Sequence, residues 1–208
     1  MDFIVTDFKL VSFFISCIAL AFSPGPDNLF LFSLSLNEKK KHCFLFLFGL
    51  ISGCLVHTFA LIIGLNLIID KVPLVLDFIK IIGFVYLIFL SIKFLFKKID
   101  NKDDLKKNQK INFYKTGFLM NVLNPKVFLF FSVFFPNFIF SNEISFNLQI
   151  LILGLIFIIS TFVIFSIIIF MSKYISKYLE SNYFFSSIKI YLSPIILFVI
   201  ALLILFVW

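Results

Sequence analysis

Long apolar runs separated by short polar segments form the dominant pattern of this 208-residue chain. A helix that crosses the hydrocarbon layer of a membrane needs about 20 mostly apolar residues. Six runs reach that length, and they predict six transmembrane helices. The predicted spans are residues 10–36, 43–69, 74–96, 117–140, 146–171 and 188–208.

A lysine- and aspartate-rich segment, residues 97–115, divides the six predicted spans into two groups of three. It lacks apolar periodicity and is typical of a polar linker. Because three is odd, the halves at about 1–96 and 116–208 would enter the membrane from opposite sides. The pattern therefore predicts an all-α, polytopic membrane protein of one transmembrane domain, built from two three-helix halves of inverted topology.

The first predicted span is interrupted by a polar stretch that begins at Ser23. It contains Pro24, Gly25, Pro26, Asp27 and Asn28. Each proline lacks an N–H and displaces the carbonyl four residues earlier, so we expect the helix to break here. Broken helices are tolerated at membrane depth where protein or a water-filled cavity receives the loose groups, and a carboxylate there indicates a functional site.

The fourth predicted span carries a second proline interruption, with Asn121, Asn124, Pro125 and Lys126. Pro125 would free the carbonyl of Asn121. A simple kink explains the prolines but gives no reason to bury a carboxylate, amides and an ammonium beside them. Interrupted hydrophobic segments at matching positions of two halves indicate a transporter's binding site near the midplane.

Composition supports a membrane protein and argues against nucleic-acid binding. Hydrophobic residues make up 62% of the chain and charged residues 14%, well below the roughly 25% charged that is usual for a soluble domain. The net charge of +7 comes from lysines that flank apolar spans instead of gathering on one soluble face. The three cysteines lack a metal-like spacing, so we expect neither a metal nor another cofactor.

The distribution of lysines predicts the orientation. The connections after the first, third and fifth spans, together with Lys189 at the start of the sixth, contain thirteen lysines, whereas the opposite side contains three. The positive-inside rule places the lysine-rich connections in the cytoplasm and both termini outside. The apolar N-terminal run is not expected to be a cleaved signal peptide, because Asp2 and Asp7 outnumber Lys9 before it.

Several polar or small residues within the spans have alternative interpretations. Gly49 and Gly53 form a G-x-x-x-G pattern that favours close helix packing and could support a homodimer. His57 is either a proton carrier or an interhelical hydrogen-bond donor. We expect Ser160 and Thr161 to be packing positions whose hydroxyls bond the preceding turn.

These stretches resemble the LysE/RhtB family of bacterial amino-acid exporters. The resemblance lies in Pro24-Gly25-Pro26-Asp27 and in the block from Gly117 to Lys126 that ends in Asn-Pro-Lys. Further similarity appears at Val56-His57, in residues 79–87, and in Phe130-Phe131 with Pro136-Asn137-Phe138, where the family usually has Gln in place of Asn137. The match covers most of the chain up to about Phe140; beyond that it rests on hydropathy.

The resemblance implies export of an amino acid or close derivative across the bacterial inner membrane, in exchange for protons. We expect the two breaks to meet, with Asp27 facing the substrate ammonium and carrying the proton, and Lys126 either pairing with Asp27 or holding the substrate carboxylate. A membrane-embedded enzyme and a non-transporting assembly subunit are the alternative classes. The candidate substrate-binding residues are Pro24, Gly25, Pro26, Asp27, Asn28, Asn121, Asn124, Pro125 and Lys126, and the candidates for proton coupling are Asp27 and His57.

Overall fold

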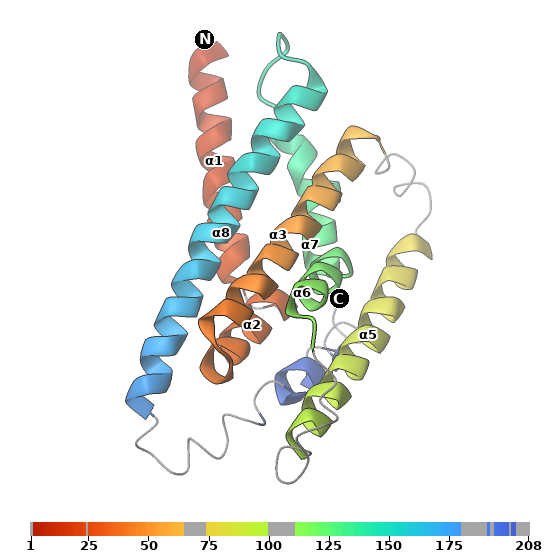
Figure 1. Cartoon of the computed structure of the whole chain (residues 1–208). Coiled ribbons are helices and arrows are strands. Elements are labelled where there is room, and N and C mark those ends of the chain that lie inside the picture. The colour runs from red at the N-terminus through yellow and green to blue at the C-terminus, as the bar shows by residue number, and fades with distance from the viewer. Residues whose placement is uncertain are drawn as a thin grey trace.

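The computed structural model describes residues 2–23, 25–64, 74–99, 111–179, 191, 194–199 and 201–202. These residues are almost entirely helical, and there is no strand among them (Figure 1). The all-α class predicted from the sequence is confirmed for this part of the chain. Pro24, the linker up to residue 110 and most of the predicted span 188–208 lie outside the described residues.

The predicted break in the first span is confirmed. Helix α1 (Asp2–Phe22) ends just before the proline-rich stretch, and α2 (Pro26–Asn37) begins at its second proline. The two helices are bent by 54° relative to each other. Pro26 occupies the first helical position of α2, where its missing N–H costs no hydrogen bond.

The fourth span is also broken, and it is less regular than predicted. Helix α6 (Phe113–Val122) ends before α7 (Pro125–Leu129), and Pro125 again takes the first helical position. The chain then continues as a π-helical turn, Phe130–Phe134, and a 3-10 turn, Phe135–Phe138. Pro136 lacks the N–H that would continue a regular helix, which explains why the geometry changes here.

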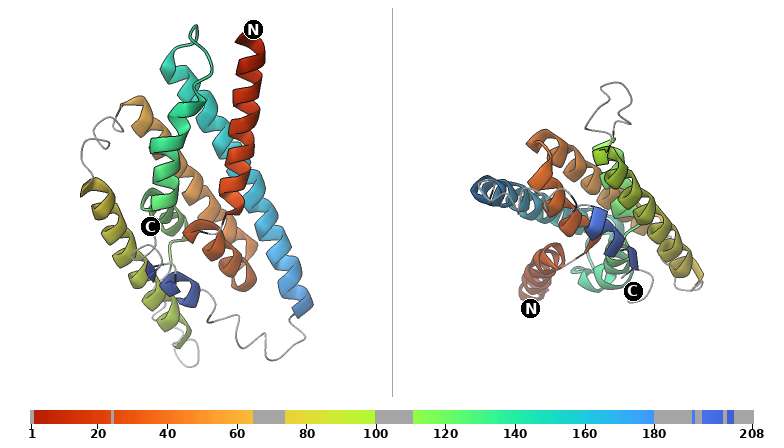
Figure 2. Two further views of the ribbon diagram at one scale, coloured as in Figure 1. Left: turned by 180° about the vertical axis from the view of Figure 1, so that it is seen from behind. Right: turned by 90° about the horizontal axis from the view of Figure 1, so that it is seen from below.

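Three further long helices belong to the described architecture. Helices α3 (Lys40–Ile62) and α8 (Phe146–Leu179) are long and apolar enough to cross a membrane, and the bent α1–α2 pair would be a third span in the described part of the chain. Helix α5 (Leu74–Ile99) lies to one side, as both views in Figure 2 show. At 34 residues, α8 is about 51 Å long and continues beyond the predicted span end at residue 171.

Helices α3 and α6 pack so closely that their glycines touch the facing backbone. A Cβ at Gly49 would collide with the carbonyl oxygen of Tyr114, and one at Gly117 would collide with that of Phe46. Gly53 lies against the side chain of Asn121 in the same way. The G-x-x-x-G face of α3 is therefore covered by α6 of the same chain, which removes the sequence argument for a homodimer formed through these glycines; dimerisation itself stays a prediction.

Helix α8 crosses both arms of the broken first span and α3, and so joins the parts of the bundle (Figures 1 and 2). Two clusters of buried apolar side chains lie along these contacts. One includes Phe30 and Phe46, whose rings meet edge to face, and the other includes Phe13 and Phe131. The two clusters account for where α1, α2 and α8 sit around the helix breaks.

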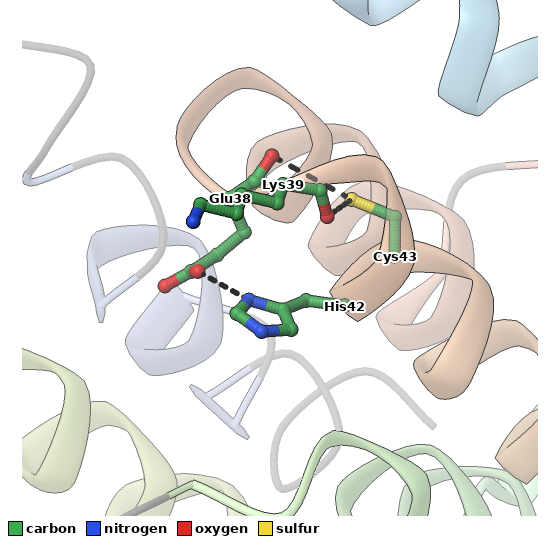
Figure 3. A network of polar contacts seen from close by, with 4 residues as sticks. All are labelled: Glu38, Lys39, His42 and Cys43. Atoms are coloured by element: carbon green, nitrogen blue, oxygen red, sulfur yellow. Dashed lines mark hydrogen bonds and ion pairs between the residues drawn. The ribbon is translucent and has the colours of Figure 1, made fainter.

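The connection between α2 and α3 is held by short local contacts (Figure 3). His42 Nδ1 lies 2.8 Å from a carboxylate oxygen of Glu38, and Cys43 Sγ lies 3.4 Å from the carbonyl oxygen of Lys39. The His42 ring also stacks on Phe113 at the start of α6, with 4.5 Å between centroids. These contacts hold the lysine-rich connection and the start of α3 against the start of α6.

We predict that Gly49→Ala prevents the close approach of α3 to α6 and lowers the melting temperature of the purified protein in detergent by several degrees, because the new methyl group meets backbone that cannot move aside. Val56→Leu, which adds a carbon to an exposed position of the same helix, serves as the matched control. Equal melting temperatures for Gly49→Ala and the control variant would contradict the packing described here.

Candidate functional site

The break between α1 and α2 is held by the side chain of Asn28. Its amide nitrogen donates to the carbonyl oxygens of Ala21 at 2.9 Å and Ser23 at 2.7 Å. Its amide oxygen accepts from the N–H of Gly25, the residue that precedes α2, at 2.9 Å. Asn28 therefore satisfies loose backbone groups on both sides of the break, and its position favours a structural role in a site where the sequence predicts a substrate ligand.

The side chain of Lys126, a residue of α7, extends to the break between α1 and α2. Its ammonium donates to the carbonyl oxygens of Leu20 at 2.7 Å and Ser23 at 2.6 Å, at the C-terminal end of α1. A cation is favourable at this end of a helix, where carbonyls carry partial negative charge. Gly25 lies against the Lys126 side chain, since a Cβ at residue 25 would lie 3.2 Å from its Cδ.

The break between α6 and α7 is satisfied by its own asparagine and by a histidine from α3. Asn124 caps α7, its side-chain oxygen accepting from the backbone N–H of Lys126 at 3.0 Å. The carbonyl of Asn121, which Pro125 frees, faces His57 Nε2 at 3.3 Å. Because a carbonyl can only accept, His57 is the donor in this contact, which matches one of the two roles considered for it.

Asp27 is where the two breaks meet. It is the second residue of α2 and is only 7% exposed. One carboxylate oxygen accepts from the amide of Asn124 at 2.8 Å, and the other accepts from the amide of Asn121 at 3.2 Å. Because the side-chain oxygen of Asn124 caps α7, the NH₂ group of the same side chain points towards Asp27. The second break therefore orients a hydrogen-bond donor for the carboxylate at the first break.

The two charged side chains are not paired as expected. Among the residues that the structure describes, no ion pair joins Asp27 to Lys126; amides bind Asp27, and backbone carbonyls bind Lys126. Of the two roles considered for Lys126, direct pairing with Asp27 is therefore not found in this arrangement. The reason is that the break exposes the carbonyl groups of Leu20 and Ser23, which accept from the ammonium in place of the carboxylate.

Both charged groups nevertheless line one cavity, together with most of the predicted site. Of the nine candidate residues, Gly25, Asp27, Asn28, Asn121, Asn124 and Lys126 line it; Pro26 and Pro125 shape the breaks beside it, and Pro24 lies outside the described residues. The cavity volume is about 20 Å³, room for water but not for an amino acid. Binding a larger solute would require the helices to move apart.

The sequence did not predict that residues of the other walls belong to the site. Cys54 of α3 lies beside Asn121, with Sγ 3.7 Å from the amide oxygen, and Phe157, Thr161 and Phe165 of α8 form the opposite wall. Nothing in the apolar run of α8 distinguishes these positions, because every face of the helix is hydrophobic. Only its packing against α2 and α3 shows which face meets the site.

Comparison with known proteins identifies relatives over most of the chain. A model of the family described as LysE type translocator matches residues 18–206. The uncharacterized membrane protein YrhP of Bacillus subtilis (strain 168) is 30% identical, with 77% of this chain and 81% of that protein covered.

Two further relatives are named leucine efflux protein. The one from Enterobacter sp. (strain 638) is 25% identical, with 76% of this chain and 77% of that protein covered. The one from Klebsiella pneumoniae is 22% identical, and the shares covered are 83% and 82%. No solved structure matches.

We predict that Asn124→Asp destabilises the protein in detergent more than Asn124→Ser, by about 1–3 kcal/mol at mildly alkaline pH. Both replacements keep an oxygen to cap α7, but the aspartate sets a second carboxylate against Asp27. Asn112→Asp makes the same change at the exposed cap of α6 and is the control. Equal unfolding free energies for the two Asn124 variants would rule out the contact with Asp27.

Proposed function

The chain belongs to the LysE type translocator family, and on that premise we propose that it is a secondary transporter that exports amino acids or close derivatives. We further propose that it works by proton antiport across the bacterial inner membrane, as one transmembrane domain. The apolar helices and the named membrane relative support a membrane location.

The observation that carries the proposal is the pair of opposite charges in the cavity between the two helix breaks. An ammonium has three N–H donors, and Lys126 uses two of them on Leu20 and Ser23. An ionised carboxylate has about four acceptor positions, and Asp27 uses two on Asn121 and Asn124. The cavity thus retains one donor for a substrate carboxylate and acceptors for a substrate ammonium, which suits a zwitterion.

The lining also supports an amino acid with an apolar side chain. Leu20, Val127, Phe157 and Phe165 contribute apolar surface to the same cavity. Two relatives at 25% and 22% identity carry the name leucine efflux protein. We therefore propose that this chain carries apolar amino acids of about the size of leucine.

Proton exchange is proposed to use Asp27. When substrate leaves, the ammonium that balanced Asp27 leaves with it, and a proton is the smallest cation that can replace it in a cavity of this size. His57 is held by the Asn121 carbonyl and does not line the cavity. Its position supports a part in securing the break more than a part in carrying protons.

The proposed arrangement has six spans in two inverted halves. Its support is the correspondence between the breaks: each lies in the first span of its half, and each has proline at the first position of the helix that follows. The second span of each predicted half, α3 in one and α8 in the other, runs as a continuous helix beside the cavity. Alternating access would then involve one half rocking against the other around Asp27.

We predict that Asp27→Asn abolishes efflux of radiolabelled leucine from preloaded proteoliposomes, reducing the initial rate at least about a hundredfold, because neither the substrate ammonium nor a proton can then be held. The exposed carboxylate Glu143, changed to Gln, is the matched control. Efflux at the wild-type rate from well-inserted Asp27→Asn protein would remove Asp27 from the mechanism. If wild-type protein carried no amino acid of a full panel, with or without a pH gradient, the transporter proposal would fail.

We predict that reporter fusions place the C-terminus outside and the lysine-rich connection 97–115 inside, as the orientation with both termini outside requires. Alkaline phosphatase fused after Trp208 should be active in the periplasm, whereas the same reporter inserted after Lys107 should be inactive, because the lysine-rich connection stays in the cytoplasm. Activity after Lys107 but not after Trp208 would overturn the proposed orientation, and equal behaviour of the two fusions would contradict an odd number of spans between them.

A further inference from the structure

One wall of the cavity is a single face of α8. Phe157, Thr161 and Phe165 follow one another at intervals of four residues, so they lie one above the other on that face. They are opposite the two helix breaks and come from a continuous helix. This wall carries no charge and one hydroxyl.

The hydroxyl of Thr161 differs from two neighbouring hydroxyls near the cavity, those of Ser160 and Thr58. Ser160 donates to the carbonyl of Ile156 at 2.7 Å, and Thr58 donates to that of Cys54 at 2.9 Å, as hydroxyls in apolar helices usually do. Thr161 was expected to do the same. Thr161 is 5% exposed and lines the cavity, and its hydroxyl makes no hydrogen bond among the residues that the structure describes. The Ser166 hydroxyl of the same helix also lacks a partner there, but Ser166 does not line the cavity.

A hydroxyl without a partner is unfavourable in an apolar wall, and that of Thr161 lies where a molecule in the cavity can supply one. If an apolar side chain filled the space in front of it, the hydroxyl would stay unsatisfied. It therefore needs a polar atom of whatever occupies the cavity. In an amino acid with an apolar side chain, the polar atoms are those of the α-ammonium and the α-carboxylate.

We propose that Thr161 is a substrate ligand that binds the main-chain polar groups of the exported amino acid, and that Phe157 and Phe165 contact its side chain. This proposal rests on the proposed function. In this arrangement α8 forms the third side of the site. Asp27 and Lys126 bind the charged ammonium and carboxylate of the substrate, and Thr161 adds a hydrogen bond common to all substrates. The rings of Phe157 and Phe165 on the adjacent turns limit the size of the substrate side chain. The substrate class is α-amino acids with apolar side chains.

The experiment measures initial transport rates of leucine, alanine and phenylalanine in proteoliposomes. Thr161→Val is nearly isosteric and removes the hydroxyl, so it should raise KM for each transported amino acid by a similar factor of at least about tenfold. Thr161→Ser, which keeps the hydroxyl, should stay within a few fold of wild type. Ser160→Ala, whose hydroxyl bonds the preceding turn instead of facing the cavity, is the matched control.

Phe165→Ala should instead change the ratio of kcat/KM for phenylalanine to that for alanine in favour of phenylalanine, because it enlarges the wall without removing a polar ligand. Stabilisation of detergent-solubilised protein by leucine gives a second readout, which Thr161→Val should lose and Thr161→Ser should keep. If the wild-type protein transports amino acids but well-folded Thr161→Val has an unchanged KM, the proposed role of Thr161 is overturned and the proposed function stands. Absence of transport by wild type would instead overturn the function itself.

Discussion

The structure depends on satisfying the backbone groups that two broken helices expose at membrane depth. Lipid offers these groups no hydrogen bonds, so protein must supply every partner. At the first break the partners are Asn28 from the following helix and Lys126 from the other broken span. At the second break they are Asn124 and His57. Lys126 of the second break donates to carbonyls of the first, and Asp27 of the first accepts from the amides of Asn121 and Asn124 at the second, so each break depends on its counterpart.

This mutual dependence explains the environment of Asp27. The carboxylate accepts hydrogen bonds from two amides, each of which makes a second contact that fixes its orientation. Asn124 caps α7, and the amide oxygen of Asn121 lies next to the thiol of Cys54. Capping thus provides donors to Asp27 without a dedicated ion pair. The opposite charges remain apart on the wall of a cavity that admits water but not an amino acid. A protein that binds a zwitterion and releases it benefits from charges that do not neutralise each other directly.

The positions of the breaks could be predicted from the sequence because proline acts on the backbone locally, and Pro26 and Pro125 begin new helices as expected. The partners of the breaks could not, since they depend on how spans far apart in the chain pack. Charge alone suggested an Asp27–Lys126 pair, whereas the loose carbonyls of Leu20 and Ser23 take the ammonium. Gly49 and Gly53 predicted close packing, but not that the facing helix is α6 of the same chain. Thr161 was indistinguishable from Ser160 within a uniformly apolar run, although only Ser160 bonds the preceding turn.

The most direct test of the account is a double-mutant cycle between the two breaks. Asp27→Ala and Asn124→Ser, singly and together, would be compared by their free energies of unfolding when sodium dodecyl sulfate is titrated into mixed micelles without substrate. The serine keeps an oxygen to cap α7, so the cycle isolates the contact across the breaks. The account predicts a coupling of at least about 1 kcal/mol between the two positions. Additive effects would show that the breaks do not hold each other, and would contradict it.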